Sequence, residues 1–190
     1  MLFTTNNTKI YKGPLNELLS PVEYIQDDLI HAYLSCITKG KRVLVVPAST
    51  GGKIFAGSTS VFKKENLNSF DQIVIPLLVG GNHWTVVLIS NLTEQLIYIN
   101  PFGTNTSSAE AIFDSWLKFA KTRKEYNFIE WSYDLVEHSI QSDSFNCGVF
   151  ICIFIEKFID YVYNNTFDTS AANLLKIRKS MAQTLETNKD

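Results

Sequence analysis

The sequence is poor in cysteine, in histidine and in excess charge of either sign. Its 190 residues include three cysteines and three histidines, and 17 Lys and Arg are balanced by 19 Asp and Glu. Three cysteines cannot pair completely and none stands in CxxC spacing, which argues against a disulfide framework and a structural zinc site. The net charge of −2 argues against a nucleic-acid-binding domain, because such domains normally carry a basic face. We expect no metal and no cofactor.

Long apolar runs and leader segments are also missing. The longest apolar stretch, residues 149–155, is far shorter than the roughly 20 residues that cross a bilayer. Residues 1–7 lack the basic region and apolar core of a signal peptide. We therefore expect a monomeric protein of the cytoplasm or nucleus, with no membrane partner.

The hydrophobic content is sufficient for a packed core. At 45% it excludes intrinsic disorder, and 190 residues is a usual length for one domain. Neither a repeat nor an interdomain linker is visible. We therefore expect residues 1–190 to form a single domain.

Hydrophobic periodicity predicts a mixed α+β fold. Helical spacing is found from a Ser20-Pro21 start to Ile37, and over residues 109–121, 148–163 and 174–185. Strands are expected at 42–47, 72–78, 84–89, 95–99 and 127–135, with a hairpin turn at 91–94. Residues 49–59 are rich in Gly and Ser and are expected to be a loop. The helix after Gly148 is apolar nearly all round, which predicts a place in the core, including its Phe150, Phe154, Phe158 and Tyr161.

The predicted hairpin brings a histidine and an asparagine together at its open end. His83 precedes one strand and Asn100 follows the other, so the two should be cross-strand neighbours within about one register step. An Asn oxygen that accepts from one ring nitrogen orients the other nitrogen, as the third member of a catalytic triad does. A structural histidine beside an Asn-Pro turn is the alternative.

A second group of residues surrounds Cys147. This cysteine stands where a polar loop becomes the apolar helix, and a helix N-terminus stabilises a thiolate. Gly148 lets a substrate backbone approach closely. The Gln141 side chain, together with the Cys147 backbone N–H, would form an oxyanion hole.

Other candidate residues receive simpler interpretations. Thr50 to Lys53 is similar to part of a phosphate loop, but the first glycine is missing and an isoleucine stands where the magnesium-binding Ser/Thr belongs. Cys36 and Cys152 lie on apolar helical stretches and are interpreted as packing residues. His31 is expected at the surface, and His138 is a candidate for lining a substrate groove.

Four motifs follow one another at characteristic spacing. They are Tyr24 to Ile30, His83-Trp84 with a polar residue seventeen positions later, Gln141 six residues before Cys147-Gly148, and Arg178 to Ala182. Together they resemble the SUMO/sentrin-specific proteases, the ubiquitin-like-protein proteases of the adenovirus-protease-like clan. The resemblance covers residues 20–185, and residues 143–150 look most like the transposon-associated or invertebrate branches.

The resemblance implies a papain-like or adenain-like α+β cysteine protease. Its central mixed sheet would be flanked by helices, with the nucleophile at the N-terminus of a buried helix. Cys147 would be the nucleophile, His83 the general base, Asn100 its orienting partner and Gln141 the oxyanion donor. Trp84 and Tyr24 would roof a tunnel for a Gly-Gly tail, and Asp27 would help to hold the body of the modifier.

Two positions depart from the family pattern. Asn100 replaces the usual Asp, and an amide orients a histidine but stabilises its imidazolium less. Tyr24 replaces a Trp, which makes the tunnel roof smaller. Neither change removes the nucleophile, the base or the oxyanion donor.

Three functions agree with these residues. The favoured one is an isopeptidase or endopeptidase that cleaves after the Gly-Gly of SUMO or ubiquitin. A clan-related acyltransferase is the second, although its relatives need a basic inositol hexakisphosphate pocket and basic residues are thinly spread here. A non-catalytic binder of ubiquitin-like proteins is the third. The preferred modifier would depend on surface loops, expected at 48–59 and 105–110.

Overall fold

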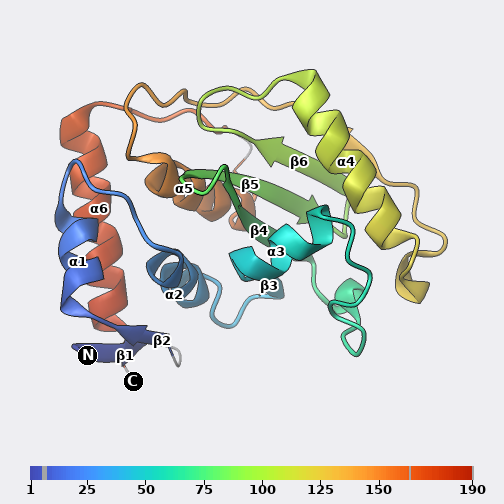
Figure 1. Cartoon of the computed structure of the whole chain (residues 1–190), viewed down its shortest axis with the longest axis horizontal. Helices are drawn as coiled ribbons and strands as arrows, with labels where there is room; N and C mark the ends of the chain where they lie inside the picture. Colours follow the sequence, from blue (N-terminus) through green and yellow to red (C-terminus); the bar gives the residue numbers. More distant parts are fainter. Residues whose placement is uncertain (6–7, 163, 190) are drawn as a thin grey trace. The chain divides into compact units, whose positions relative to one another are not determined.

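The computed structural model describes residues 1–5, 8–162 and 164–189 (Figure 1). The predicted α+β architecture with a mixed sheet is confirmed. The chain divides into two compact units, one made of residues 1–41 and 137–190 and the other of residues 42–136. Over the described part of the chain, no helix is both long and apolar enough to cross a membrane.

A five-stranded mixed sheet forms the centre of the unit 42–136. Its strands, in spatial order, are β3 (Val43–Val45), β4 (Gln72–Val79), β5 (His83–Ser90), β6 (Gln95–Ile99) and β7 (Ser132–Asp134). The outer pairs β3–β4 and β6–β7 are parallel, and the inner pairs β4–β5 and β5–β6 are antiparallel. The predicted hairpin of β5 and β6 is confirmed, with Ser90 opposite Gln95 beside the turn.

Two helices pack against this sheet, α3 (Ala48–Phe55) on β4 and α4 (Thr106–Ala120) on β6 and β7. Alternate strand side chains enter one core with Trp116 and Phe119 of α4, because successive residues of a strand point to opposite faces. Asn105 caps α4, since its Oδ1 accepts the Ser108 N–H at 2.8 Å.

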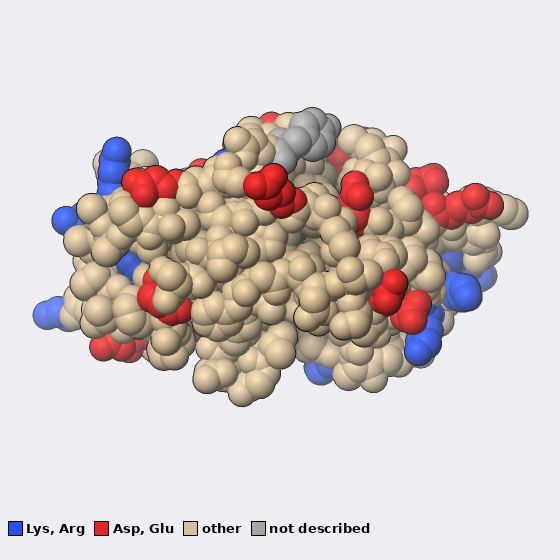
Figure 2. All heavy atoms as spheres, turned by 90° about the horizontal axis from the view of Figure 1, so that it is seen from above, with Lys and Arg blue, Asp and Glu red and all other residues tan. Residues whose placement is uncertain are grey.

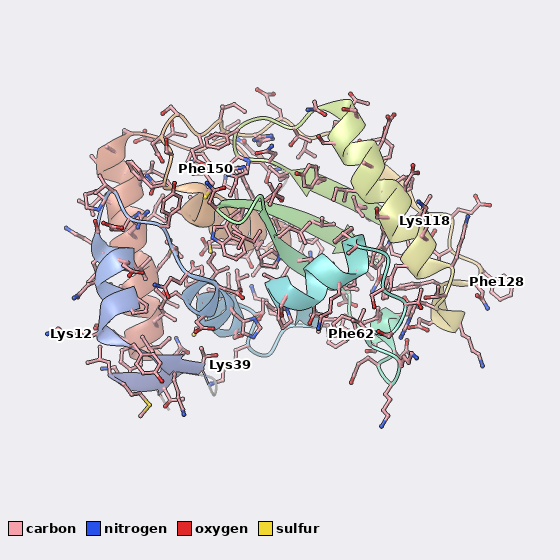
Figure 3. The ribbon with its side chains drawn as sticks, in the orientation of Figure 1. Lys12, Lys39, Phe62, Lys118, Phe128 and Phe150 are labelled. Carbon is pink, nitrogen blue, oxygen red and sulfur yellow. The ribbon has the colours of Figure 1, made fainter. Side chains whose placement is uncertain are left out.

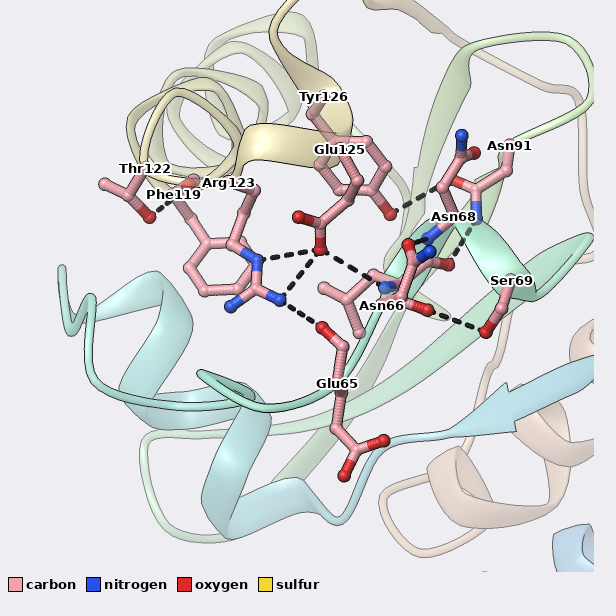
Figure 4. A network of polar contacts seen from close by, with 11 residues as sticks. Glu65, Asn66, Asn68, Ser69, Asn91, Phe119, Thr122, Arg123, Glu125 and Tyr126 are labelled. Atoms are coloured by element: carbon pink, nitrogen blue, oxygen red, sulfur yellow. Dashed lines mark hydrogen bonds and ion pairs between the residues drawn. The ribbon is translucent and has the colours of Figure 1, made fainter.

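A polar network fixes two short 3₁₀ helices of this unit, η1 (Leu67–Ser69) and η2 (Lys124–Tyr126) (Figure 4). Arg123 donates to Glu125 Oε1 through Nε at 3.0 Å and also bonds the Glu65 carbonyl. The same carboxylate oxygen accepts the Leu67 N–H. Burial opposes ionisation of Glu125, but these hydrogen bonds outweigh it and hold its pKa below the usual value.

The unit formed by residues 1–41 and 137–190 is mainly helical. It contains a β-hairpin, β1 (Phe3–Thr5) with β2 (Thr8–Ile10), and four helices, α1 (Lys12–Leu19), α2 (Asp27–Ile37), α5 (Cys147–Ile159) and α6 (Ala171–Thr187). Helices α1, α2 and α5 all pack against α6, and α2 also packs against α5. Phe150 and Phe154 of α5 are fully buried and contact the Phe167 ring, so their predicted core role is confirmed (Figure 3).

The predicted helix start at Ser20-Pro21 is wrong. Ser20 ends α1 in an extended conformation, with φ −80° and ψ 136°, and α2 begins only at Asp27. The reason is Pro21, because a proline disfavours the helical conformation of the residue before it. The Ser-Pro pair therefore terminates one helix instead of starting the next.

The predicted loop at residues 49–59 is also wrong over most of its length, because α3 occupies Ala48–Phe55. Gly51 explains the error. A Cβ on this residue would lie 2.4 Å from Ile75 Cγ2, so glycine here permits close packing of α3 on β4. The second expected loop, 105–110, is the capped first turn of α4.

Two other predicted boundaries need correction. Helix α5 ends at Ile159 and Tyr161 has a left-handed φ of 56° and is 50% exposed, so Tyr161 is not a core residue. The predicted end of that helix, Tyr163, lies outside the described residues. The strand expected at 127–135 is reduced to β7, because η2 precedes it and Phe128 projects from the surface at 98% exposure (Figure 3).

Candidate active site

Cys147 is the first residue of α5, as predicted. Asn146 is the N-cap residue, and its carbonyl accepts the Phe150 N–H at 3.0 Å. Cys147 is 1% exposed, and Gly148, the next residue of the helix, is also buried. A thiolate here would be stabilised by the dipole of a thirteen-residue helix.

Gln141 lies in the segment that leads to Cys147 and is 3% exposed. Its Nε2 donates to the Asp143 carbonyl at 2.9 Å and to Asp143 Oδ1 at 3.1 Å. Asp143, which the sequence analysis did not single out, thus holds the predicted oxyanion donor.

Asp143 organises this segment. Its Oδ1 accepts the backbone N–H groups of Phe145 and Asn146 at 2.9 and 2.8 Å, and its Oδ2 accepts the Asn146 side-chain amide at 2.8 Å. Burial opposes ionisation of the carboxyl, but these donors and Gln141 outweigh it and lower the pKa of Asp143. The hydrogen bond from the Phe145 N–H to the Asp143 side chain, two residues earlier, is typical of an Asx turn. An Asp in a polar loop favours this turn, so the sequence contained a signal for it.

His83 and Asn100 lie together in the unit of residues 42–136. His83 Nε2 lies 2.8 Å from Asn100 Oδ1, which confirms that the hairpin brings them together. The pairing of β5 with β6 ends at Val86 opposite Ile99. In this register Asn100 lies two residues from the position directly opposite His83, so the two are diagonal neighbours, whereas an offset of at most about one residue was expected.

The hydrogen bonds also fix the histidine tautomer. The Phe102 backbone N–H donates to Asn100 Oδ1 at 3.0 Å, so that atom is the carbonyl oxygen of the amide. A carbonyl oxygen only accepts, so in the neutral ring Nε2 carries the proton. Nδ1 of His83 then holds the lone pair that a general base needs.

Phe102 is a site residue that the sequence does not single out, because the Asn-Pro dipeptide before it indicates only a turn. Its ring stacks on the His83 ring, with centroids 4.4 Å apart and planes at 10°. The turn itself explains this position: the Gly103 N–H donates to the Asn100 carbonyl at 2.8 Å, and Gly103 has a φ of 111° that suits glycine. Its signal was the Asn-Pro dipeptide, which favours such a turn.

The candidate substrate-binding residues differ in exposure. Trp84 follows His83 in β5 and is 4% exposed, whereas Tyr24 is 44% exposed. Asp27 is the first residue of α2, where a carboxylate complements the helix dipole. Partial burial raises the pKa of Asp27, the charge of Asp28 raises it further, and His31 opposes the shift.

The residues given packing roles behave as expected. Cys36 and Cys152 are buried, and burial raises the pKa of the Cys152 thiol far above its usual value. His138, the candidate for lining a substrate groove, packs its ring edge-on against Phe154, with centroids 5.5 Å apart, and the groove role stays a prediction. Within the described ranges, no group of three or more His, Cys, Asp or Glu side chains could hold a metal ion. On the face drawn in Figure 2, charged side chains stand singly or in small groups with uncharged surface between them.

These parts define a class of protein. A cysteine that begins a buried helix and a histidine oriented by an amide are the chemical groups of a cysteine protease. The family is shown directly: the chain belongs to the Ulp1 protease family, because the model of the family's C-terminal catalytic domain matches residues 32–189. It is an Ulp1-family cysteine protease domain, as the resemblance implied.

Solved structures have the same fold. The SUMO protease Ulp1 with its catalytic cysteine oxidised to a sulfenic acid has a TM-score of 0.84 at 16% identity, over 98% of this chain and 87% of that one. The Ulp1 domain in complex with Smt3, the yeast orthologue of SUMO, has a TM-score of 0.79 at 14% identity, with the same coverage. The Xanthomonas campestris effector XopD bound to ubiquitin has a TM-score of 0.56 at 13% identity, over 85% and 91% of the two chains. No curated protein sequence matches the chain.

Proposed function

We propose that this protein is an isopeptidase that cleaves after the C-terminal Gly-Gly of a ubiquitin-like modifier, either SUMO or ubiquitin. The observation that carries the proposal is the His83–Asn100 pair, with Nε2 and Oδ1 2.8 Å apart, because it leaves Nδ1 as a base. Structural relatives support the choice of substrate, since one is in complex with Smt3 and another is bound to ubiquitin.

The reaction has two acyl-transfer steps. His83 Nδ1 takes the proton of the Cys147 thiol, and the sulfur attacks the carbonyl carbon of the terminal glycine. The bond to the lysine ε-amine then breaks, and the imidazolium gives its proton to this leaving group. A water molecule, deprotonated by His83, hydrolyses the thioester and regenerates the thiol.

The developing oxyanion would be bound by the Cys147 backbone N–H and by one N–H of the Gln141 side-chain amide, which is available when the two Asp143 oxygens share the other N–H. Each such donor contributes several kcal/mol only when it points at the oxyanion before the reaction begins. Trp84 and Tyr24 would enclose the Gly-Gly tail, and Asp27 would contact the modifier body. An aromatic roof admits glycine because glycine has no side chain.

A panel of modifiers with C-terminal electrophiles tests the proposal. We expect SUMO or ubiquitin vinyl sulfone to form a covalent adduct with the wild-type protein and none with Cys147→Ser, because serine is not activated by the same base. Intact mass and peptide mapping would locate the adduct. If no modifier forms an adduct, the chain is a non-catalytic binder or acts on another acyl group, and the proposal is wrong.

Asn100→Ala is expected to reduce kcat about 10- to 100-fold, much less than loss of the nucleophile. An uncharged amide orients the ring but stabilises the imidazolium less than a carboxylate does, so its removal costs less than that of an Asp partner. The measurement is steady-state cleavage of the modifier captured in the panel. An equal loss of kcat in Asn100→Ala and Cys147→Ala would contradict this ranking.

A further inference from the structure

Three side chains connect Gln141 and the residue before Cys147 to the last helix of the same unit: Asp143, which is half-buried, and Asn146 and Arg178, which are buried. Asp143 binds the Gln141 amide and the Asn146 amide, as described above. Asn146, 3% exposed, turns its Oδ1 to Arg178 Nε of α6 at 2.8 Å. A continuous chain of hydrogen bonds therefore runs from Gln141 through Asp143 and Asn146 to Arg178. Arg178 itself is fully buried.

Arg178 also donates hydrogen bonds to four backbone carbonyls. Its guanidinium donates to the carbonyls of Glu17 and Leu18 at 3.2 and 3.3 Å, to that of Glu23 at 2.6 Å and to that of Phe145 at 3.4 Å. The arginine therefore connects α6, the last turn of α1, the segment between α1 and α2, and the two residues before Cys147.

We propose that Asp143, Asn146 and Arg178 are positioning residues of the protease, which hold Gln141 and Cys147 in the relative geometry that acyl transfer needs. This inference rests on the proposed function, since it names Gln141 as oxyanion donor. Asp143 fixes the direction of the amide: turning the Gln141 amide over would place Oε1 against two acceptor oxygens. Gln141 Oε1 has no hydrogen-bond partner among the described residues that would favour either direction.

Charge supports the same arrangement. Burial lowers the pKa of Arg178, and the negative charges of Asp143, Cys147 and Glu23 oppose this shift. The neutral amide of Asn146 carries the contact between Asp143 and Arg178.

Substitutions can exchange the acceptor role of residue 143 with the amide donor role of residue 146. In Asp143→Asn, the NH2 group of the new amide faces Asn146 Nδ2, so two donors meet. Turning the Asn146 amide over removes this conflict but places Nδ2 against Arg178 Nε, where two donors meet again. In Asn146→Asp, two carboxylates meet and share one arginine. In the double variant, the amide introduced at position 143 donates to one oxygen of the carboxylate introduced at position 146, and Arg178 donates to the other. Every donor then again has an acceptor.

The test compares these three variants by cleavage of the modifier captured in the panel. We expect Asp143→Asn and Asn146→Asp each to lower kcat about 100-fold with little change in KM, because small displacements of reacting groups have effects of this size. The double variant should recover to within about fivefold of wild type, since its network is complete. Asp168→Asn is the matched control: Asp168 Oδ1 also accepts a turn amide, that of Ser170 at 2.9 Å, and we expect wild-type kcat.

Two outcomes would overturn the inference. One is a wild-type kcat in the single variants; the other is a double variant that melts like wild type but stays as slow as Asp143→Asn. Thermal melting of all variants separates unfolding from misplacement. If wild type itself captures no modifier, the proposed function fails, and the rate of Cys147 carbamidomethylation by iodoacetamide then tests the network. A lower rate in the single variants with recovery in the double variant supports the network, and equal rates in all variants reject it.

Discussion

Cys147→Ala is expected to lower kcat for modifier cleavage by about 10⁴-fold or more, because removing the nucleophile of a catalytic set leaves only binding and oxyanion stabilisation. Cys147 is the cysteine that begins α5, and its sulfur is the group of the proposed site that forms a bond to the substrate. Binding of the modifier should persist, since the residues assigned to it are unchanged. Steady-state kinetics and a binding titration with the uncleaved modifier measure the two effects separately.

Cys152→Ala is the matched control for this prediction. Cys152 lies on the same helix, five residues further along, and is also buried at 1% exposure. Burial raises the pKa of its thiol, so this sulfur stays protonated and unreactive. We expect an unchanged kcat and a stability loss of about 1 kcal/mol. If Cys152→Ala abolished turnover and Cys147→Ala did not, the assignment of the nucleophile would be wrong.

Arg178→Leu is expected to lower the free energy of unfolding by about 3–5 kcal/mol, because it removes a fully buried cation and all its hydrogen bonds. The substitution takes one donor from Asn146 Oδ1 and from four backbone carbonyls, of which that of Glu17 keeps the Ser20 N–H. For a domain stabilised by about 5–15 kcal/mol, this is a large part of the total. Urea unfolding followed by tryptophan fluorescence measures the change.

Lys179→Leu provides the comparison for Arg178→Leu. Lys179 is the next residue of α6 and is exposed, so it tests the loss of a cation from the same helix without loss of buried hydrogen bonds. We expect a change within about 0.5 kcal/mol, as for most surface substitutions. Similar urea midpoints for the Arg178 variant and the wild type would show that the buried carbonyls find other donors.

Much of the fold could be predicted because its strongest patterns are local. The strands at 72–78 and 95–99 and the final helix at 174–185 all lie within elements of the structure. The errors arose where tertiary packing gives a residue another role. Gly51 suggests a loop in the sequence, but it permits the close approach of α3 to Ile75. Ser20-Pro21 has the composition of a helix start, but it lies at a helix end.

Only part of the site could be predicted from the sequence, for a similar reason. His83 and Asn100 could be paired from hairpin register alone, and Cys147 could be placed at a helix start from the change in polarity. Arg178 could not be given a role, because its partners lie up to 161 residues away in the sequence. Only a fold shows that a residue of α6 bonds Asn146, the residue next to Cys147.

The bonds of Arg178 also bear on the order of synthesis. Its partner Asn146 is made 32 residues earlier, and Glu17 is made 161 residues earlier. While a ribosome is still adding α6, the segment before Cys147 lacks its anchor, although the cysteine itself has been translated. The segment before Cys147 therefore gains its bonds to Arg178 only after α6 has left the ribosome and packed. If Cys147 is the nucleophile proposed above, its surroundings are completed among the last steps of synthesis.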